Sequence, residues 1–262
     1  MKTRGAKLGQ HFLTAHWVAV ALARAANITS DTTVVEIGPG KGALTVELLK
    51  LSDHVIAIEK DSTLVERLHE KFPEKISNGA LLVVNADIRN VTPESLKLAA
   101  GEYVIAANIP YYITGEIIRQ FLSTAVQPRT MALLVQKEVA QRIVARDGKE
   151  SILSLSVKAY GTPRIVDKVS RKCFSPAPSI DSAILAIDDI STKSFSQINE
   201  EQFFKVVHVG FASKPKYLTS NLGAIFDKEK IHTAFVQFGI NEKSRAEDVP
   251  LEKWLKLVTL NY

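Results

Sequence analysis

Cysteine is almost absent from this chain of 262 residues, in which Cys173 is the only one. A single thiol forms no intrachain disulfide, so the hydrophobic core has to stabilise the fold. The six histidines show no metal-ligand spacing such as H-x-x-x-H. We therefore expect neither a structural nor a catalytic metal.

Long apolar runs and early acidic residues are also missing. No run approaches the roughly 20 apolar residues that a membrane-spanning helix needs, so we expect a cytoplasmic protein. The first acidic residue is Asp31, and a basic, acid-poor start is typical of targeting peptides. However, Gln10, His11 and His16 interrupt the apolar stretch of a signal peptide and Arg24 ends it, so we expect no targeting segment.

Length and charge give two weaker indications. A chain of 262 residues can hold one large domain and one small appendage, because single cores stop growing near 250 to 300 residues. The net charge of +5 is compatible with a polyanionic partner, although many basic proteins bind none.

Predicted strands and helices alternate over the first 145 residues. Short apolar runs predict strands at 34–37, 54–59, 81–84, 103–107 and 131–135. Amphipathic stretches predict helices from residue 14 and at 43–50, 62–71, 113–122 and 137–145. This alternation predicts an α/β fold with a parallel, doubly wound sheet. Residues 153–159 and 183–187 are expected to close it as an antiparallel pair of strands.

The character of the chain changes after residue 188. Residues 188–196 are polar and contain serines, which is typical of a linker. Helices are predicted at 200–211, 217–226, 228–238 and 251–259. We therefore predict one domain at 1–188 and a small helical domain at 189–262.

A glycine-rich loop follows the first predicted strand of the sheet. Gly38, Gly40 and Gly42 allow a ligand to approach the backbone closely, and the next helix offers its free N–H groups. The spacing is G-x-G-x-G and not the G-x-G-x-x-G of dinucleotide sites, which favours a nucleoside with a carboxylate tail. A simple tight turn is the alternative.

Acidic residues end the next two predicted strands. Glu59 lies about 20 residues after the loop, where a carboxylate can accept both ribose hydroxyls. The alternative for Glu59 is a surface ion pair with Lys60 or Lys41. Asp87 can accept a hydrogen bond from an adenine amino group, or it can cap a helix.

The tetrad Asn108-Ile109-Pro110-Tyr111 directly follows the fourth predicted strand. Its Asn108 oxygen and a backbone carbonyl at Ile109 or Pro110 can hold both protons of an aromatic amine, which frees the lone pair of that amine. Tyr111 would stack on the base and aim the amine at an activated methyl group, so alignment suffices without a general base. A proline-containing turn with a core tyrosine is the alternative.

Four segments in this order resemble the family of KsgA-type ribosomal RNA adenine dimethyltransferases over residues 9–187. They are Gln10-His11-Phe12-Leu13, Glu36 to Gly42, Asn108 to Tyr111, and Phe174-Ser-Pro-Ala-Pro-Ser-Ile-Asp-Ser-Ala183. The resemblance implies a Rossmann-like methyltransferase sheet and S-adenosylmethionine as the methyl donor. The contacts that it implies for the donor are Gln10, His11, Leu13, Gly38, Gly40, Glu59, Asp87 and Asn108. It also implies that Tyr111 and Phe174 sandwich the target adenine.

The implied product is N6,N6-dimethyladenosine at two adjacent adenosines in a hairpin near the 3′ end of small-subunit ribosomal RNA. The implied partner is an assembling ribosomal particle. We expect a monomer that binds the RNA through its helical domain and through Lys7, Lys214 and Lys216. Relatives usually carry Arg-Arg-Lys where this chain has Ser213-Lys214-Pro215-Lys216. We expect this departure to affect the strength and placement of docking on the ribosomal particle and not the methyl transfer itself.

Other functions remain open at this stage. An erythromycin-resistance type of enzyme shares the tetrad but methylates large-subunit RNA, and the 174–183 segment together with Arg245-Ala246-Glu247 argues against it. A DNA adenine methyltransferase is disfavoured, because such enzymes typically carry an Asp-Pro-Pro-Tyr type of tetrad and this chain has Asn-Ile-Pro-Tyr. A non-catalytic assembly factor of the same fold and an NAD-dependent oxidoreductase are further alternatives.

Overall fold

The computed structural model describes residues 11–260, which divide into two compact units. The sheet unit holds residues up to 140 together with 162–190, and the helical unit holds 141–161 together with 191 onward. Residues 141–161 thus group with the helical unit, whereas the sequence placed them in the first domain. The reason is packing, because the ring of Tyr160 contacts Phe195 and Phe204 in the helical unit.

A seven-stranded sheet forms the sheet unit, in the order β4-β3-β2-β5-β6-β9-β7. Its strands are β2 (Thr33–Ile37), β3 (Val55–Glu59), β4 (Leu81–Asn85), β5 (Tyr103–Asn108), β6 (Thr130–Gln136), β7 (Thr162–Val169) and β9 (Ser182–Asp188). The first five are parallel, and β9 runs antiparallel to β6 and to β7. The five parallel strands confirm the predicted α/β sheet.

The predicted strand at 153–159 is wrong. These residues lie in helix α7 (Ile152–Lys158), and β7 takes the edge position beside β9. The helix forms because Ser151 and Ser154 make a reciprocal capping box, which satisfies N–H groups of its first turn.

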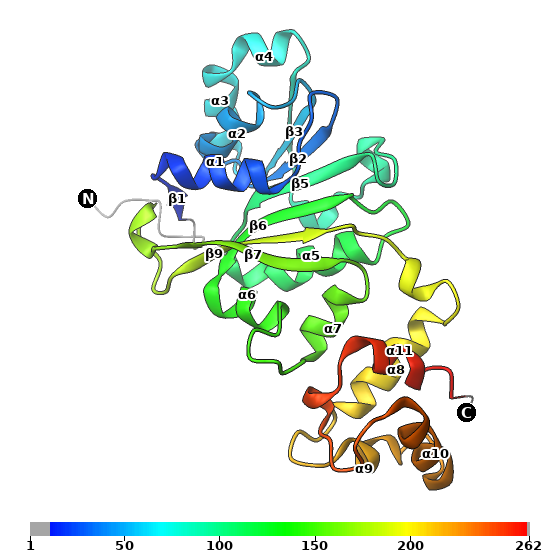
Figure 1. Cartoon of the computed structure of the whole chain (residues 1–262). Coiled ribbons are helices and arrows are strands. Elements are labelled where there is room, and N and C mark those ends of the chain that lie inside the picture. Colours follow the sequence, from blue (N-terminus) through cyan, green and yellow to red (C-terminus); the bar gives the residue numbers. More distant parts are fainter. Residues whose placement is uncertain (1–10, 261–262) are drawn as a thin grey trace. The chain divides into compact units, whose positions relative to one another are not determined.

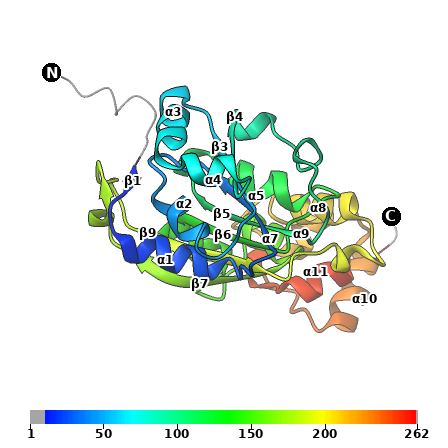
Figure 2. The same cartoon turned by 90° about the horizontal axis from the view of Figure 1, so that it is seen from above.

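Helices cover both faces of the sheet. Helix α1 (His16–Ala25) crosses in front of the strands in Figure 1, whereas α5 (Thr114–Leu122) lies behind them. Figure 2 also shows these two helices on opposite sides of the sheet. The remaining helices of this unit are α2 (Ala43–Leu48), α3 (Ser62–Lys71) and α4 (Pro73–Ser77), and α6 (Lys137–Ile143) spans the division between the units. The central strands are fully buried, which explains their continuous apolar runs.

A short second sheet was not predicted from the sequence. Strand β1 (Phe12–Leu13) pairs antiparallel with β8 (Phe174–Ser175), so Leu13 lies opposite Phe174. This pairing brings the beginning of the described chain to the segment that leads into β9.

The helical unit has its own aromatic core. Its helices are α7, α8 (Glu200–Gly210), α9 (Leu218–Leu222), α10 (Lys228–Phe238) and α11 (Leu251–Leu257). Trp254 is fully buried, stacks on Phe211, and donates a hydrogen bond to the Val249 carbonyl (2.9 Å). No helix among residues 11–260 is long and apolar enough to cross a membrane.

Candidate active site

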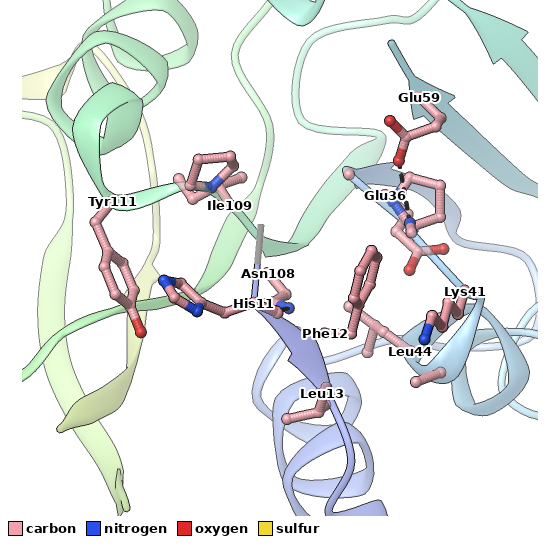
Figure 3. A pocket seen from close by; sticks show the side chains of 15 residues that line it. His11, Phe12, Leu13, Glu36, Lys41, Leu44, Glu59, Asn108, Ile109 and Tyr111 are labelled. Atoms are coloured by element: carbon pink, nitrogen blue, oxygen red, sulfur yellow. Dashed lines mark hydrogen bonds between the residues drawn. The ribbon is translucent and has the colours of Figure 1, made fainter. Parts of the chain in front are cut away.

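A pocket lies where the strand order reverses, at the carboxyl ends of β2 and β5 (Figure 3). Open α/β sheets bind their ligands at this switch point, because the loops diverge there to opposite faces of the sheet. Of the predicted site residues, those that line the pocket are His11, Leu13, Gly38, Gly40, Glu59, Asn108, Ile109, Pro110 and Tyr111.

The glycine loop forms one side of this pocket. Gly38, Gly40 and Gly42 all have positive φ (70°, 57° and 74°), which residues with a Cβ rarely adopt. A Cβ on Gly40 would also lie 3.2 Å from the ring of Phe12. The loop therefore needs glycine for its backbone shape and for the approach of Phe12.

Glu59 supports the loop from the end of β3. Its Oε2 accepts a hydrogen bond from Gly40 N (3.1 Å), and its Oε1 accepts one from Asp61 N (3.0 Å). Its predicted alternative is not observed, since Lys60 pairs with Asp87 and Lys41 lies over the Phe12 ring. A carboxylate has about four acceptor sites, so Glu59 can also receive ribose hydroxyls.

Glu36 is a buried acid in β2 whose role the sequence pattern did not indicate. It is 1% exposed, and its Oε2 accepts a hydrogen bond from the Thr45 hydroxyl (2.7 Å). Its Oε1 has no hydrogen-bond partner within residues 11–260. Burial raises the pKa of Glu36 to about 8, with a smaller upward contribution from Glu59, while Thr45 and Lys71 lower it. Glu36 thus holds a proton at neutral pH.

Asn108 has its amide orientation set by a long-range contact. Its Nδ2 donates a hydrogen bond to the backbone carbonyl of His11 (3.3 Å). Because that carbonyl can only accept, the amide nitrogen faces His11 and Oδ1 is directed elsewhere. Oδ1 thus remains available as an acceptor.

The Tyr111 ring is tied to the segment that follows β8. Its hydroxyl is hydrogen-bonded to Ser182 Oγ (2.7 Å), and the imidazole of His11 stacks on the ring with centroids 6.0 Å apart and planes 26° apart. His11 Nδ1 donates to the Pro176 carbonyl (2.8 Å). Burial raises the pKa of Tyr111, so its hydroxyl is protonated at neutral pH.

Two predicted residues lie apart from the pocket lining. Phe174 is 4% exposed and packs in the core of the sheet unit. Asp87 caps a single 3-10 turn and pairs with Lys60 (2.8 Å) and Arg89 (2.6 Å), which hold the pKa of its carboxyl well below the usual range. Their roles as base-stacking and cofactor residues stay predictions.

The predicted nucleic-acid contacts lie in different parts of the chain. Lys214 and Lys216 are exposed in the non-helical segment between α8 and α9. Lys7 lies outside the described residues, as does Gln10, which was predicted to contact the cofactor.

Sequence reasoning missed several residues of the pocket lining. Phe12, Lys41 and Leu44 line it beside Glu36. An acid in the apolar run Val34-Val35-Glu36-Ile37 was a usable signal, because a buried carboxyl needs a reason to be there. Within residues 11–260 no group of three or more His, Cys, Asp or Glu side chains is placed to hold a metal.

Comparison with known proteins decides the family. The family described as ribosomal RNA adenine dimethylase matches residues 1–261. This chain belongs to the ribosomal RNA adenine dimethylase family. The family establishes the reaction class: the chain is an S-adenosylmethionine-dependent methyltransferase that acts on adenine in ribosomal RNA.

Individual family members match almost the whole chain. Ribosomal RNA small subunit methyltransferase A of Dehalococcoides mccartyi strain CBDB1 is 40% identical over 252 residues, which cover 95% of this chain and 86% of the relative. The protein of the same name from Clostridium botulinum strain Loch Maree is 35% identical over 253 residues, with coverage of 95% and 91%.

Solved structures agree with the fold. A dimethyladenosine transferase from Plasmodium falciparum superposes with a TM-score of 0.79 at 26% identity, covering 94% of this chain and 96% of that one. The 23S rRNA methyltransferase ErmE superposes with a TM-score of 0.78 at 25% identity, with coverage of 95% and 98%. Fold similarity alone thus does not separate the two RNA targets.

The pocket residues also fit S-adenosylmethionine chemically. Gly38 and Gly40 line the pocket with backbone that carries no side chain, which suits a ligand lying against the backbone. The unpartnered Oε1 of Glu36 offers a hydrogen-bonding site to a polar ligand group, and Glu59 offers acceptors to a ribose. The family assignment and the G-x-G-x-G spacing of the loop exclude the NAD-dependent alternative.

Proposed function

We propose that this chain transfers methyl groups from S-adenosylmethionine to N6 of two adjacent adenosines in a hairpin near the 3′ end of small-subunit ribosomal RNA. The product would be N6,N6-dimethyladenosine, formed on an assembling ribosomal particle. We further propose that the protein acts as a monomer in the cytoplasm. The observation that carries the proposal is the placement of Asn108 and Tyr111 beside the glycine loop in one pocket.

The choice of the small subunit rests on sequence identity. Four relatives at 33–40% identity bear the name ribosomal RNA small subunit methyltransferase A. The large-subunit enzyme ErmE shares the fold at only 25% identity. The 174–183 segment, which runs through β8 into β9, supports the same choice.

The chain's own residues would act mainly by alignment. Oδ1 of Asn108 accepts a hydrogen bond from one N–H of the target amine, and a backbone carbonyl accepts one from the other N–H. These two hydrogen bonds direct the nitrogen lone pair at the methyl group that the cofactor supplies. The Pro110 carbonyl already accepts a hydrogen bond from Ile113 N (3.2 Å), so Ile109 is our preferred carbonyl. The methylated amine carries a positive charge and loses its proton to water.

The amide of Asn108 cannot rotate freely during this step. Turning Oδ1 toward His11 would place two acceptors against each other and lose the hydrogen bond. The orientation of the acceptor is therefore set before the base arrives, which lowers the entropic cost of alignment.

Methylation assays on two RNA targets test this function. The purified chain is incubated with labelled S-adenosylmethionine and either small-subunit particles that lack the modification or large-subunit RNA, and the nucleosides are analysed by mass spectrometry. We expect N6,N6-dimethyladenosine in the small-subunit RNA alone. Methylation of large-subunit RNA instead would transfer the assignment to the erythromycin-resistance type, and no methylation of either would favour a non-catalytic assembly factor.

A further inference from the structure

The glycine loop consists of residues that do not keep one conformation by themselves. Gly38, Gly40 and Gly42 all have positive φ in the structure, whereas an unrestrained glycine populates many other conformations. A ligand that binds a flexible loop has to order it, and this ordering costs affinity. Contacts from outside the loop are therefore needed to keep it in one shape before the cofactor binds.

Glu59 joins the loop to the beginning of helix α3. One oxygen of its carboxylate accepts a hydrogen bond from Gly40 N in the loop, and the other accepts one from Asp61 N. Asp61 is the N-cap of α3, and its own carboxylate accepts a hydrogen bond from Thr63 N (2.9 Å) in the first turn. The beginning of α3 is thereby fixed to one side of the loop.

Lys71 joins the loop to the end of the same helix. It is the last residue of α3, and its Nζ donates hydrogen bonds to the carbonyls of Lys41 (2.9 Å) and Gly42 (3.2 Å). The ammonium also lies 5.1 Å from the centre of the Phe72 ring, a cation–π distance that further fixes its place. Lys71 thus satisfies two backbone acceptors of the loop itself and does not form an ordinary surface ion pair through these contacts.

These two carbonyls determine which way the loop presents its N–H groups. In a trans peptide, the N–H of the next residue points away from the side to which the carbonyl points. The carbonyl of Gly42 shares its peptide plane with the N–H of Ala43, and Ala43 lines the pocket beside Gly40 and Lys41. Holding the Gly42 carbonyl against Lys71 therefore also fixes the direction of the Ala43 N–H.

We propose that Lys71 is a positioning residue for S-adenosylmethionine, which acts by holding the glycine loop in its binding shape from the side of α3. Among residues 11–260, those that line the pocket do not include Lys71, so it acts through the loop and not by contact with the cofactor. Packing supports this placement, since a Cβ on Gly42 would lie 2.8 Å from the Phe72 ring and 3.1 Å from Leu68. Lys71 would have this role whichever RNA the chain methylates.

Substitutions at Lys71 separate its hydrogen bonds from its charge and its apolar stem. Lys71→Met keeps an apolar stem and removes the donors, whereas Lys71→Arg restores a cation that can donate to two carbonyls. Arg67→Met is the matched control, because it removes the same charge from an exposed position one turn earlier on α3. Calorimetry measures the affinity for cationic S-adenosylmethionine and for S-adenosylhomocysteine, which lacks the sulfonium charge.

We expect Lys71→Met to weaken the binding of both ligands alike, by about 3- to 30-fold, because the loop loses a charged hydrogen-bond donor. Lys71→Arg should bind both within about twofold of the unsubstituted chain, and Arg67→Met should bind normally. The charge of Lys71 by itself has the opposite effect, since its removal would favour the cationic ligand over the other one. Backbone hydrogen exchange without ligand should become faster at residues 38–46 in Lys71→Met and not in Arg67→Met.

Three results would overturn this role of Lys71. Affinities and hydrogen exchange in Lys71→Met that match those of Arg67→Met would show that the loop keeps its shape without Lys71. An equal loss of affinity in Lys71→Arg and Lys71→Met would show that the donated hydrogen bonds are not what matters. Tighter binding of S-adenosylmethionine alone in Lys71→Met would show that Lys71 acts only through its charge. Circular dichroism shows that each variant is folded, and Lys71→Gln, which is neutral and shorter, takes the place of an unfolded Met variant with the same expected losses.

Discussion

The side-chain nitrogen of Asn108 is hydrogen-bonded to the backbone carbonyl of His11, 97 residues earlier in the chain, at 3.3 Å. This contact ties the end of β5 to the beginning of the described chain. It leaves Oδ1 of Asn108 without this partner, and we propose that Oδ1 accepts a hydrogen bond from the target amine, so that the nitrogen and oxygen of one amide have different functions.

Replacing Asn108 separates these two functions. Asn108→Ala removes the acceptor and should lower kcat by about 100-fold or more, because a preorganised polar group is lost at the reacting atom. Asn108→Asp keeps an acceptor oxygen but loses the donor to His11, so it should retain more activity than Asn108→Ala. Methyl transfer to small-subunit particles is the measurement, with calorimetry to show that cofactor affinity falls less than activity. Full activity of Asn108→Ala would refute the role of the amide oxygen.

Glu36 should make stability depend on pH. Its pKa is raised to about 8 in the folded chain from about 4.5 when unfolded, so the folded state holds the extra proton between these values. Its contribution to the free energy of unfolding is fully present below about pH 4.5 and is lost as the pH rises to about 8. At about 1.4 kcal/mol per pKa unit, this loss amounts to several kcal/mol. Glu36→Gln keeps the shape without the titration and should be more stable than the unsubstituted chain at pH 8.5.

Urea unfolding at pH 5, 7 and 8.5 measures this difference. The gap between the Glu36→Gln variant and the unsubstituted chain should widen with increasing pH. A gap that is constant across the three pH values would show that the carboxyl is already ionised in the folded chain.

Glu59 should control cofactor affinity through the glycine loop. Glu59→Gln replaces one carboxylate oxygen by an N–H₂ group, which then faces a backbone N–H of Gly40 or Asp61. An unsatisfied buried donor costs about 1 to 3 kcal/mol, so we expect affinity for S-adenosylmethionine to fall by about 5- to 100-fold in calorimetry. Glu66→Gln, on the exposed side of α3, is the control and should bind normally. Normal binding by Glu59→Gln would show that the loop does not depend on this carboxylate.

Lys214 and Lys216 test how the helical unit contacts RNA. These two exposed lysines lie together in a turn. We expect them to bind RNA phosphates without sequence preference. Replacing both by alanine should reduce the slope of log affinity against log salt by at most about two. The matched control replaces Lys228 and Lys243, two exposed lysines of the same unit, and should leave the slope unchanged. The same slope in both double variants would remove Lys214 and Lys216 from the interface.

Most of the sheet was predictable because its central strands are buried on both faces. Val34, Val104 and Leu133 belong to continuous apolar runs that only a covered parallel strand requires. The predicted strand at 183–187 is confirmed as β9, whereas the prediction of its edge partner at 153–159 failed. Residues 153–157 alternate apolar and serine residues as a half-exposed strand does, yet the capping box of Ser151 starts a helix there. Strand β7 contains a proline and charged residues, which only an edge position tolerates.

Within the site, residues at strand ends were predictable and their partners were not. Glu59 and Asn108 end predicted strands, and parallel strands bring their carboxyl ends to one edge of the sheet. Asp87 ends the third strand by the same logic, but Lys60 and Arg89 surround its carboxylate in the structure. Nothing in the spacing of the sequence indicates those ion pairs.

The sequence by itself determined the reaction class, because the glycine loop and the tetrad at 108–111 are short segments whose chemistry is local. Tertiary structure alone decided that His11 lies over Tyr111 and that Phe174 is buried in the core. The physical reason is that both facts depend on the pairing of β1 with β8, between segments about 160 residues apart. No local pattern in the sequence reports the side-chain packing that such a pairing creates.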